Sequence, residues 1–385
     1  MAQVYTAKEM LARLVGFDTE SHRSNLELIG FVEDYLAGHG VESTRVWDDT
    51  GEKAALHALV GPAEPGGVIL SGHTDVVPVA GQDWTSDPYT LREADGRLYG
   101  RGAADMKGFL AVCLAAVPRM RAAGLARPIQ LALSYDEETG CLGAPRLIAA
   151  MREALPAASA AIIGEPTSMK LVTGHKAVVR FDTELRGHEV HSSLLPYGVS
   201  AVMEAADLVQ WMARQTEENR RNANPDSPFD PPFTTLHVGT IQGGSAQNIT
   251  ARECRFPGEI RAVPGESLDE WMSAYRAQAA ALEAKMQAVH PDTWVKVTLT
   301  TSVPGCRAEE GGAAEALLRR ITGDNDSAVV SYGTEAGQFQ EAGYSAAVCG
   351  PGSIEQAHQP DEFISLEQLA AGEAFVARLI DELAG

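Results

Sequence analysis

Short apolar runs alternate with longer amphipathic or apolar stretches over the first and last parts of the sequence. The runs predict strands over 41–47, 54–60, 67–71, 129–134, 160–163, 328–331 and 346–349. The stretches predict helices over 109–123, 143–154 and 313–321, and others that begin near 336 and at 365. Strands that alternate with helices predict an α/β fold, with a central, largely parallel mixed sheet flanked by helices.

The residues between these parts follow another order. They predict a strand over 178–185, a helix over 199–214, a polar loop over 215–232, strands over 234–241 and 248–261, a helix over 267–286 and a strand over 294–301. This order, βαββαβ, is typical of a self-contained ferredoxin-like domain. We therefore expect an α/β domain made of residues 1–177 and 304–385, interrupted by an inserted domain at 178–303.

Charge and composition exclude several classes of partner. The 385 residues include 31 Lys and Arg against 52 Asp and Glu, which gives a formal net charge of −21. This charge repels phosphate backbones and anionic lipids, so we expect neither nucleic acid nor membrane as a partner. The longest apolar run, 109–117, is far shorter than the ~20 residues that span a bilayer. Five cysteines without CxxC spacing, and no apolar signal core at the start, predict reduced thiols and a cytoplasmic location.

Histidine and acidic residues gather where the predicted strands end or where the helix predicted over 109–123 begins. They are His73 and Asp75, Asp105, Glu137 and Glu138, Glu165, and His358. Each of these residues alone is typical of a turn or a solvated surface. Ligand sites in open α/β sheets form beyond the carboxyl ends of the strands, so the convergence of these residues indicates one site.

The mixture of side chains in this group favours divalent metal ions. Two histidines and several carboxylates, with no cysteine, suit Zn²⁺, Co²⁺ or Mn²⁺. The surplus of carboxylates suits two cations bridged by one aspartate, which together acidify a water and polarise a carbonyl group. Adjacent Glu137 and Glu138 predict a division of roles, in which one binds metal and the other acts as the general base.

These motifs resemble those of the dinuclear-zinc amidohydrolase and exopeptidase family, which includes aminoacylases, succinyl-diaminopimelate desuccinylases and glutamate carboxypeptidases. The resemblance covers essentially the whole chain. Within the family, the chain looks most like the branch that removes the acetyl group from N²-acetyl-L-ornithine in arginine biosynthesis. That likeness rests on the runs 164–169, 174–176, 187–193, 332–337 and 349–362. It implies hydrolysis of a small N-acyl amino acid, with L-ornithine and acetate as products.

The resemblance also implies two divalent metal ions per subunit, with zinc the first choice and cobalt or manganese the alternatives. One ion would be held by His73 and Glu165, the other by Glu138 and His358, and Asp105 would bridge the two.

Two further roles follow from the resemblance. Glu137 would be the general base that activates the water between the metal ions, and later the acid that protonates the leaving amine. Asp75 would orient the imidazole of His73. The peptide bond after Asp105 is commonly cis in this family, so we expect a cis bond there.

The inserted domain is implied to be a lid through which the protein forms a homodimer. His191 would cross the dimer interface and donate to the oxyanion in the partner's site. Asn248, Arg261 and Gly350 are assigned to substrate binding, and Glu335 to the distal ammonium group of ornithine. The sequence departs from the family pattern in lacking a proline soon after Asn248 and an aspartate two residues before Arg261.

Several alternatives stay open. A desuccinylase, an aminoacylase or a glutamate carboxypeptidase-type hydrolase would carry the same metal motifs. Outside enzymes, a two-domain solute-binding protein also fits a pair of α/β domains, although Glu137 and Glu138 argue against it. A dinucleotide-dependent oxidoreductase is excluded because no predicted strand is followed by a G-x-G-x-x-G turn.

Overall fold

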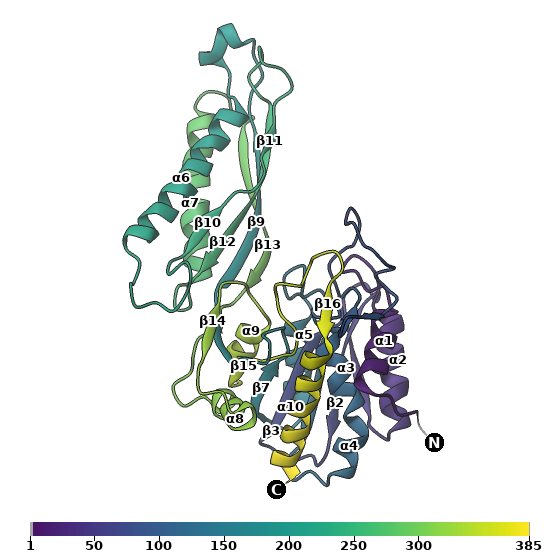
Figure 1. Cartoon of the computed structure of the whole chain (residues 1–385). Helices are drawn as coiled ribbons and strands as arrows, with labels where there is room; N and C mark the ends of the chain where they lie inside the picture. Colours follow the sequence, from purple (N-terminus) through teal and green to yellow (C-terminus); the bar gives the residue numbers. More distant parts are fainter. Residues whose placement is uncertain (1–2, 385) are drawn as a thin grey trace. The chain divides into compact units, whose positions relative to one another are not determined.

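A mixed sheet of eight strands is the main element of the fold (Figure 1). The structure is a computed structural model that describes residues 3–384. Within these residues the strand order is β1-β2-β6-β3-β7-β15-β8-β14. The strands are β1 (Ser43–Trp47), β2 (Ala54–Val60), β3 (Gly67–His73), β6 (Ile129–Ser134), β7 (Ala158–Ile163), β8 (Val172–His175), β14 (Ala328–Val330) and β15 (Ala346–Val348). The inner strands β6, β3, β7 and β15 pair in parallel, which confirms the predicted α/β class.

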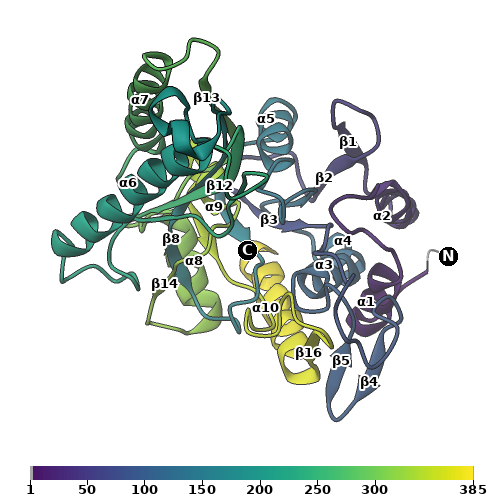
Figure 2. The same cartoon turned by 90° about the horizontal axis from the view of Figure 1, so that it is seen from above.

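Helices flank both faces of this sheet (Figure 2). They are α1 (Ala7–Val15), α2 (Leu26–Gly38), α3 (Lys107–Ala115), α4 (Val117–Ala122), α5 (Ala144–Ala154), α8 (Ala313–Thr322), α9 (Ala336–Glu341) and α10 (Leu366–Ala384). Helix α3 packs against β3 between α1 and α10, and α5 contacts α9 on the other face. Helix α3 is buried on all sides, as expected from the apolar sequence that follows its first residue, Lys107, which is also buried.

The predicted helix over 109–123 is two helices in the structure. Helix α3 ends at Ala115 and α4 begins at Val117, with Ala116 between them. Pro118 lies in the first turn of α4, where its missing N–H needs no helical partner. The proline therefore starts a new helix instead of continuing the old one.

The chain divides into two compact units. The first comprises the residues up to Gly174, Cys306–Val329 and the residues from Thr334 onwards. The second comprises His175–Gly305 and the short segment Val330–Gly333, which the sequence analysis assigned to 304–385. A small antiparallel sheet of β4 (Arg92–Ala94), β5 (Arg97–Tyr99) and β16 (Phe363–Ser365), which the sequence did not predict, belongs to the first unit.

The second unit is an antiparallel sheet covered by two helices. Its strands run in the order β10-β12-β9-β13, with β11 paired to β12. The elements are β9 (Ala177–Arg186), η1 (Ser192–Tyr197), α6 (Ala201–Arg221), β10 (Thr235–His237), β11 (Gln242–Gly243), β12 (Glu253–Ala262), α7 (Leu268–Gln287) and β13 (Trp294–Val303). Burial alternates along β9 and β12, so one face of the sheet packs against α6 and α7. Apart from β11 and the single 3₁₀ turn η1, the order is the expected βαββαβ.

The predicted loop over 215–232 is partly wrong, because α6 continues to Arg221. Glu217 lies three and four residues before Arg220 and Arg221 and pairs with both, which supports the added turns. Conversely, β10 and β12 are shorter than the strands predicted over 234–241 and 248–261. Among the described residues, no helix combines the length and the apolar character that crossing a membrane requires.

Candidate active site

The predicted metal ligands meet at one edge of the eight-stranded sheet, within the first unit. His73 ends β3, Glu138 and Glu165 lie in the loops after β6 and β7, and His358 lies between β15 and β16. Asp105 lies two residues before the start of α3. Because β3, β6, β7 and β15 are parallel, their carboxyl ends share this edge, and residues far apart in sequence converge there.

Asp105 lies between the two histidines. Its Oδ1 is 3.0 Å from Nε2 of His73, and its Oδ2 is 3.3 Å from Nε2 of His358. Each carboxylate oxygen therefore faces a different imidazole, which is the arrangement that a residue shared by two metal ions must have. The peptide bond between Asp105 and Met106 is cis, as expected.

Two glutamates complete the two halves of the group. Oε1 of Glu165 is 3.9 Å from Nε2 of His73, and Oε2 of Glu138 is 3.0 Å from Nε2 of His358. Ligand atoms of His73, Asp105 and Glu138 lie within 4.8 Å of one another, as do those of His73, Glu137 and Glu165. Oε1 of Glu165 is buried and has no hydrogen-bond partner among the described residues. A donor set of imidazoles, carboxylates and one unpartnered buried oxygen fits divalent metal ions.

Burial disfavours the ionised form of the carboxyl groups in this cluster. It raises the pKa of Glu137 and of Glu165 well above the usual range, and that of Glu138 to about 7. Neighbouring carboxylates raise these values further. Although burial alone would raise the pKa of Asp105, hydrogen bonds from His358 and His73 lower it. Cations bound here would offset the charge of the carboxylates and favour their ionised form.

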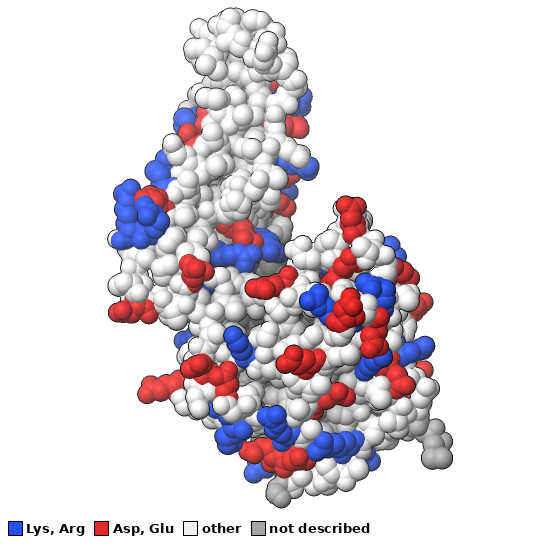
Figure 3. All heavy atoms as spheres, viewed as in Figure 1, with Lys and Arg blue, Asp and Glu red and all other residues white. Residues whose placement is uncertain are grey.

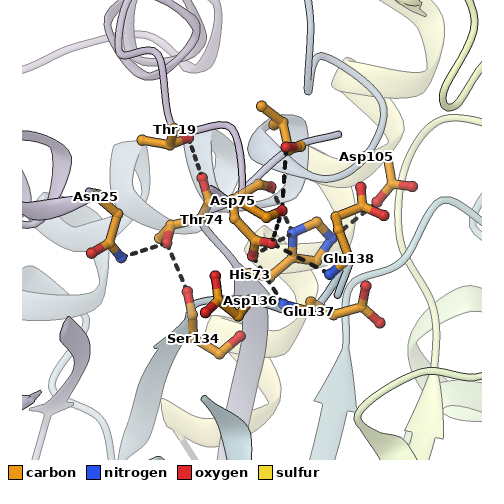
Figure 4. Close-up of polar contacts among 12 residues, drawn as sticks. Thr19, Asn25, His73, Thr74, Asp75, Asp105, Ser134, Asp136, Glu137 and Glu138 are labelled. Carbon is orange, nitrogen blue, oxygen red and sulfur yellow. Dashed lines mark hydrogen bonds and ion pairs between the residues drawn. The ribbon is translucent and has the colours of Figure 1, made fainter. Parts of the chain in front are cut away.

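Asp75 holds the loop that carries both glutamates (Figure 4). Its Oδ1 accepts the backbone N–H of Glu137 at 3.1 Å, and its Oδ2 accepts that of Glu138 at 3.3 Å. The backbone carbonyl of Asp75 lies 2.9 Å from Nδ1 of His73, closer than its carboxylate at 3.5 Å. Asp75 therefore contacts His73 mainly through its carbonyl, and its carboxylate also fixes the position of the loop after β6.

The sequence analysis missed a supporting network from the N-terminal loop. Oγ of Ser21 donates to Oδ2 of Asp75 at 2.7 Å. Thr19 donates to the carbonyl of Thr74, whose hydroxyl accepts from Asn25 and donates to the carbonyl of Ser134 (Figure 4). These side chains are buried. The run of polar residues over 18–25, between two amphipathic helices, is typical of a solvated surface loop and did not indicate these buried contacts.

Glu137 has one further neighbour that was not predicted. Sγ of Cys141 lies 3.3 Å from Oε1 of Glu137 and can donate its thiol proton to it. The carbonyl of Cys141 in turn accepts from Nε2 of Gln338 at 3.0 Å. One oxygen of Glu137 is thus engaged by the thiol.

Two of the predicted substrate-binding residues also belong to the first unit. Glu335 is buried, with Oε2 at 3.3 Å from the hydroxyl of Ser71 and Oε1 without a hydrogen-bond partner among the described residues. Burial raises the pKa of its carboxyl group. Gly350 packs closely on the backbone at Gly164, where a Cβ atom would lie 2.0 Å from the carbonyl oxygen. A side chain at this position is therefore excluded by the loop after β7.

The other predicted residues lie in the second unit. His191 and Asn248 are adjacent, since the backbone N–H of Ser192 donates to the carbonyl of Asn248 at 2.9 Å. Arg261 is at the opposite end of the sheet, on β12, with its Nε 2.7 Å from Oε1 of Glu259. The structure therefore brings His191 and Asn248 together and leaves Arg261 apart from them.

The comparisons with known proteins show the family of this chain. Residues 69–382 match the model of Peptidase family M20/M25/M40. The chain is 37% identical over 387 residues to an acetylornithine deacetylase of Myxococcus xanthus, with 97% of each protein covered. It is 36% identical to an acetylornithine deacetylase of Yersinia pestis, with 98% of this chain and 96% of the relative covered.

Solved structures share the fold. An M20 family metallo-carboxypeptidase from Sulfolobus solfataricus superposes with a TM-score of 0.77 at 16% identity, covering 99% of both chains. A tripeptidase from Staphylococcus aureus superposes with a TM-score of 0.77 at 19% identity, covering 99% of this chain and 100% of that one. The chain therefore belongs to Peptidase family M20/M25/M40 and is a metal-dependent hydrolase.

Proposed function

We propose that this protein hydrolyses N²-acetyl-L-ornithine to L-ornithine and acetate. The observation that carries the proposal is the carboxylate of Asp105 between two histidine–glutamate pairs, with Glu137 beside them. Relatives at 31–37% identity over nearly their whole length are named for this reaction. The five cysteines are unpaired and buried, which supports a cytoplasmic enzyme.

The residues of the site divide into two sets of ligands. His73 and Glu165 would hold one divalent ion, Glu138 and His358 the other, and Asp105 would contact both. Zinc is the first choice, with cobalt or manganese as alternatives. When bound, the ions polarise the acetyl carbonyl and lower the pKa of a water molecule.

Glu137 moves the proton in this scheme. Its carboxylate takes a proton from the attacking water as the water oxygen bonds to the acetyl carbon. When the carbon–nitrogen bond breaks, Glu137 returns the proton to the leaving α-amine. The thiol of Cys141 occupies Oε1 of Glu137, which leaves Oε2 for the proton.

We further propose that the second unit forms a homodimer. Large apolar side chains are exposed on η1, at the start of α6 and in the loop before β12, namely Leu194, Leu195, Tyr197, Met203 and Ile249. Figure 3 shows this end of the unit, at the top of the view, as a mostly uncharged surface. A second copy of the chain would cover such a surface and would bring His191 to the partner's site, where it donates to the oxyanion.

A subunit-mixing experiment tests this role of His191. In the proposed dimer, each site takes Glu137 from one chain and His191 from the other. Each of the variants Glu137→Ala and His191→Ala lacks one of these two residues. If His191 acts in the partner's site, a mixed dimer regains one complete site, and mixing the two inactive proteins restores activity. If mixing restores nothing although the dimers exchange subunits, His191 does not act across an interface.

Four residues are assigned to the substrate. Asn248 and Arg261 would bind its carboxylate or carbonyl group. Glu335 would face the distal ammonium group of ornithine, which is supported by its buried and unpartnered Oε1. Gly350 would line the substrate site through its backbone, since its close packing on Gly164 admits no side chain.

Metal analysis of the purified protein, together with release of ornithine from acetylornithine, tests the proposed function. We expect two metal ions per chain and turnover of acetylornithine above that of succinyl-diaminopimelate, N-acetylmethionine or a glutamate-terminated peptide. A preference for one of the other substrates would show that acetylornithine is not the substrate, while the assignment as a hydrolase would stand. Two bound metal ions without turnover of any of these substrates would overturn the proposal.

A further inference from the structure

We propose that Glu362 is a positioning residue that fixes Asp105 relative to His358 and so sets the affinity of the metal site that these two residues share. Glu362 is not one of the predicted ligands, and nothing in the mechanism above uses it. The inference rests on the proposed metal site. It concerns how two loops, one before α3 and one between β15 and β16, are held in fixed positions relative to each other.

The carboxylate of Glu362 is buried and receives four hydrogen bonds from the loop that carries Asp105. Its side chain is 1% exposed. Oε1 accepts the backbone N–H groups of Ala104 at 2.9 Å and of Asp105 at 3.0 Å. Oε2 accepts the backbone N–H of Gly102 at 3.0 Å and Nη1 of Arg101 at 2.7 Å. Both oxygens are thereby satisfied, and the backbone of Asp105 itself is one of the donors.

Arg101 extends the connection to His358. Its side chain, also 1% exposed, pairs with Glu362 and donates to the carbonyl of Gln359 at 3.3 Å. It also donates to Oε1 of Gln82, and Nε2 of Gln82 donates to the carbonyl of His358 at 2.8 Å. A continuous chain of polar contacts therefore links the backbone of Asp105 to the backbone of His358.

Residues in both loops adopt backbone conformations with a positive φ angle. His358 adopts a φ of 62°, in the left-handed region that side chains other than glycine rarely occupy, and Gly102 adopts a φ of 78°. The conformation of His358 persists when the surrounding contacts determine it. The backbone N–H of Gly100 also donates to the carbonyl of Glu362 at 2.9 Å, so the two segments are joined through both main chain and side chain.

The chemistry of this contact requires a carboxylate. All four of its partners are donors, two on each oxygen. Glutamine has the same shape but only one acceptor oxygen, so its NH₂ group would face two donors in either orientation. Glu362→Gln therefore removes half of the contacts without changing the volume of the side chain.

The experiment titrates metal-free Glu362→Gln with Co²⁺ and Zn²⁺ against a competing chelator and records the visible spectrum of bound Co²⁺. We expect the site of Glu138 and His358 to bind about 10- to 100-fold more weakly. The site of His73 and Glu165 should change less. The control is Glu33→Gln, which breaks a half-buried ion pair with Arg45 away from the site. It should bind both ions as the unaltered protein does.

A folded Glu362→Gln protein that binds both ions with unaltered affinity and an unaltered Co²⁺ spectrum would overturn the inference. If this variant does not fold, Arg101→Lys decides instead, because lysine keeps the charge but cannot reach Glu362, Gln359 and Gln82 together. Weaker metal binding at the site of Glu138 and His358 in Arg101→Lys supports the inference, and unaltered binding at that site overturns it. The titration uses no substrate, so its result can be interpreted even if the proposed function is wrong.

Discussion

Asp75 accepts the backbone N–H of Glu137 at 3.1 Å, so the loop after β3 fixes the proposed general base that follows β6. The same carboxylate accepts from Glu138 and from the hydroxyl of Ser21. Asp75 therefore acts on two neighbouring loops, in addition to its contact with His73.

Replacing Asp75 with asparagine should reduce kcat/KM for acetylornithine by about 10- to 100-fold. An amide has one acceptor oxygen, so one of the two glutamate N–H groups would face an NH₂ group. Steady-state kinetics measures the loss. Asp49→Asn, which alters an exposed ion pair with Arg146, serves as the control and should leave kcat/KM unchanged. Equal kinetics for the two variants would argue against a role of Asp75 in positioning.

Glu137→Ala should lower kcat by about 10²-fold or more while both metal ions stay bound, because this residue transfers the proton. Turnover numbers and metal content per chain are measured on the same preparation. His73→Ala provides the contrast, since removal of a ligand should lower metal content. Turnover near that of the unaltered enzyme in Glu137→Ala would show that another group is the base.

Glu335→Gln tests the partner of the ornithine side chain. If the carboxylate pairs with the distal ammonium group, the variant should lose much of its preference for acetylornithine over acetylnorvaline, which lacks that group. The ratio of the two kcat/KM values is the measurement, because a general loss of folded enzyme affects both equally. An unchanged ratio would remove Glu335 from the substrate site.

His175 should make the fold sensitive to acid. Burial lowers the pKa of its imidazole from 6.5 to about 4, and the ring is fully buried. Between these values the unfolded chain binds a proton that the folded chain does not, so stability falls as the pH falls through this range. The expected loss from pH 7 to pH 5 is about 2 kcal/mol.

Denaturant unfolding at pH 7 and pH 5 measures this effect. His175→Gln, which cannot gain a proton, should lose less stability over the same interval than the unaltered protein. The same pH dependence in both proteins would mean that other groups cause it.

Much of the fold was predictable because it depends on local patterns. The strands over 54–60 and 129–134 were predicted to the residue, since a buried strand is a continuous apolar run bounded by turns. Errors arose where local signals were weak or competed. Pro118 divides one predicted helix into two, and charged residues extend α6 into a predicted loop.

The sequence alone determined the kind of chemistry, because residue type and position after each strand limit which metal and which reaction a site can support. His73, Asp105, Glu138, Glu165 and His358 could be named as a group on that basis. Only the tertiary structure decided which oxygen of Asp105 faces which histidine, and which buried partners hold the loops. The sequence did not predict the roles of Ser21 and Glu362, because a polar residue in a loop is expected to be solvated. Only the packing of distant segments around these residues buries them.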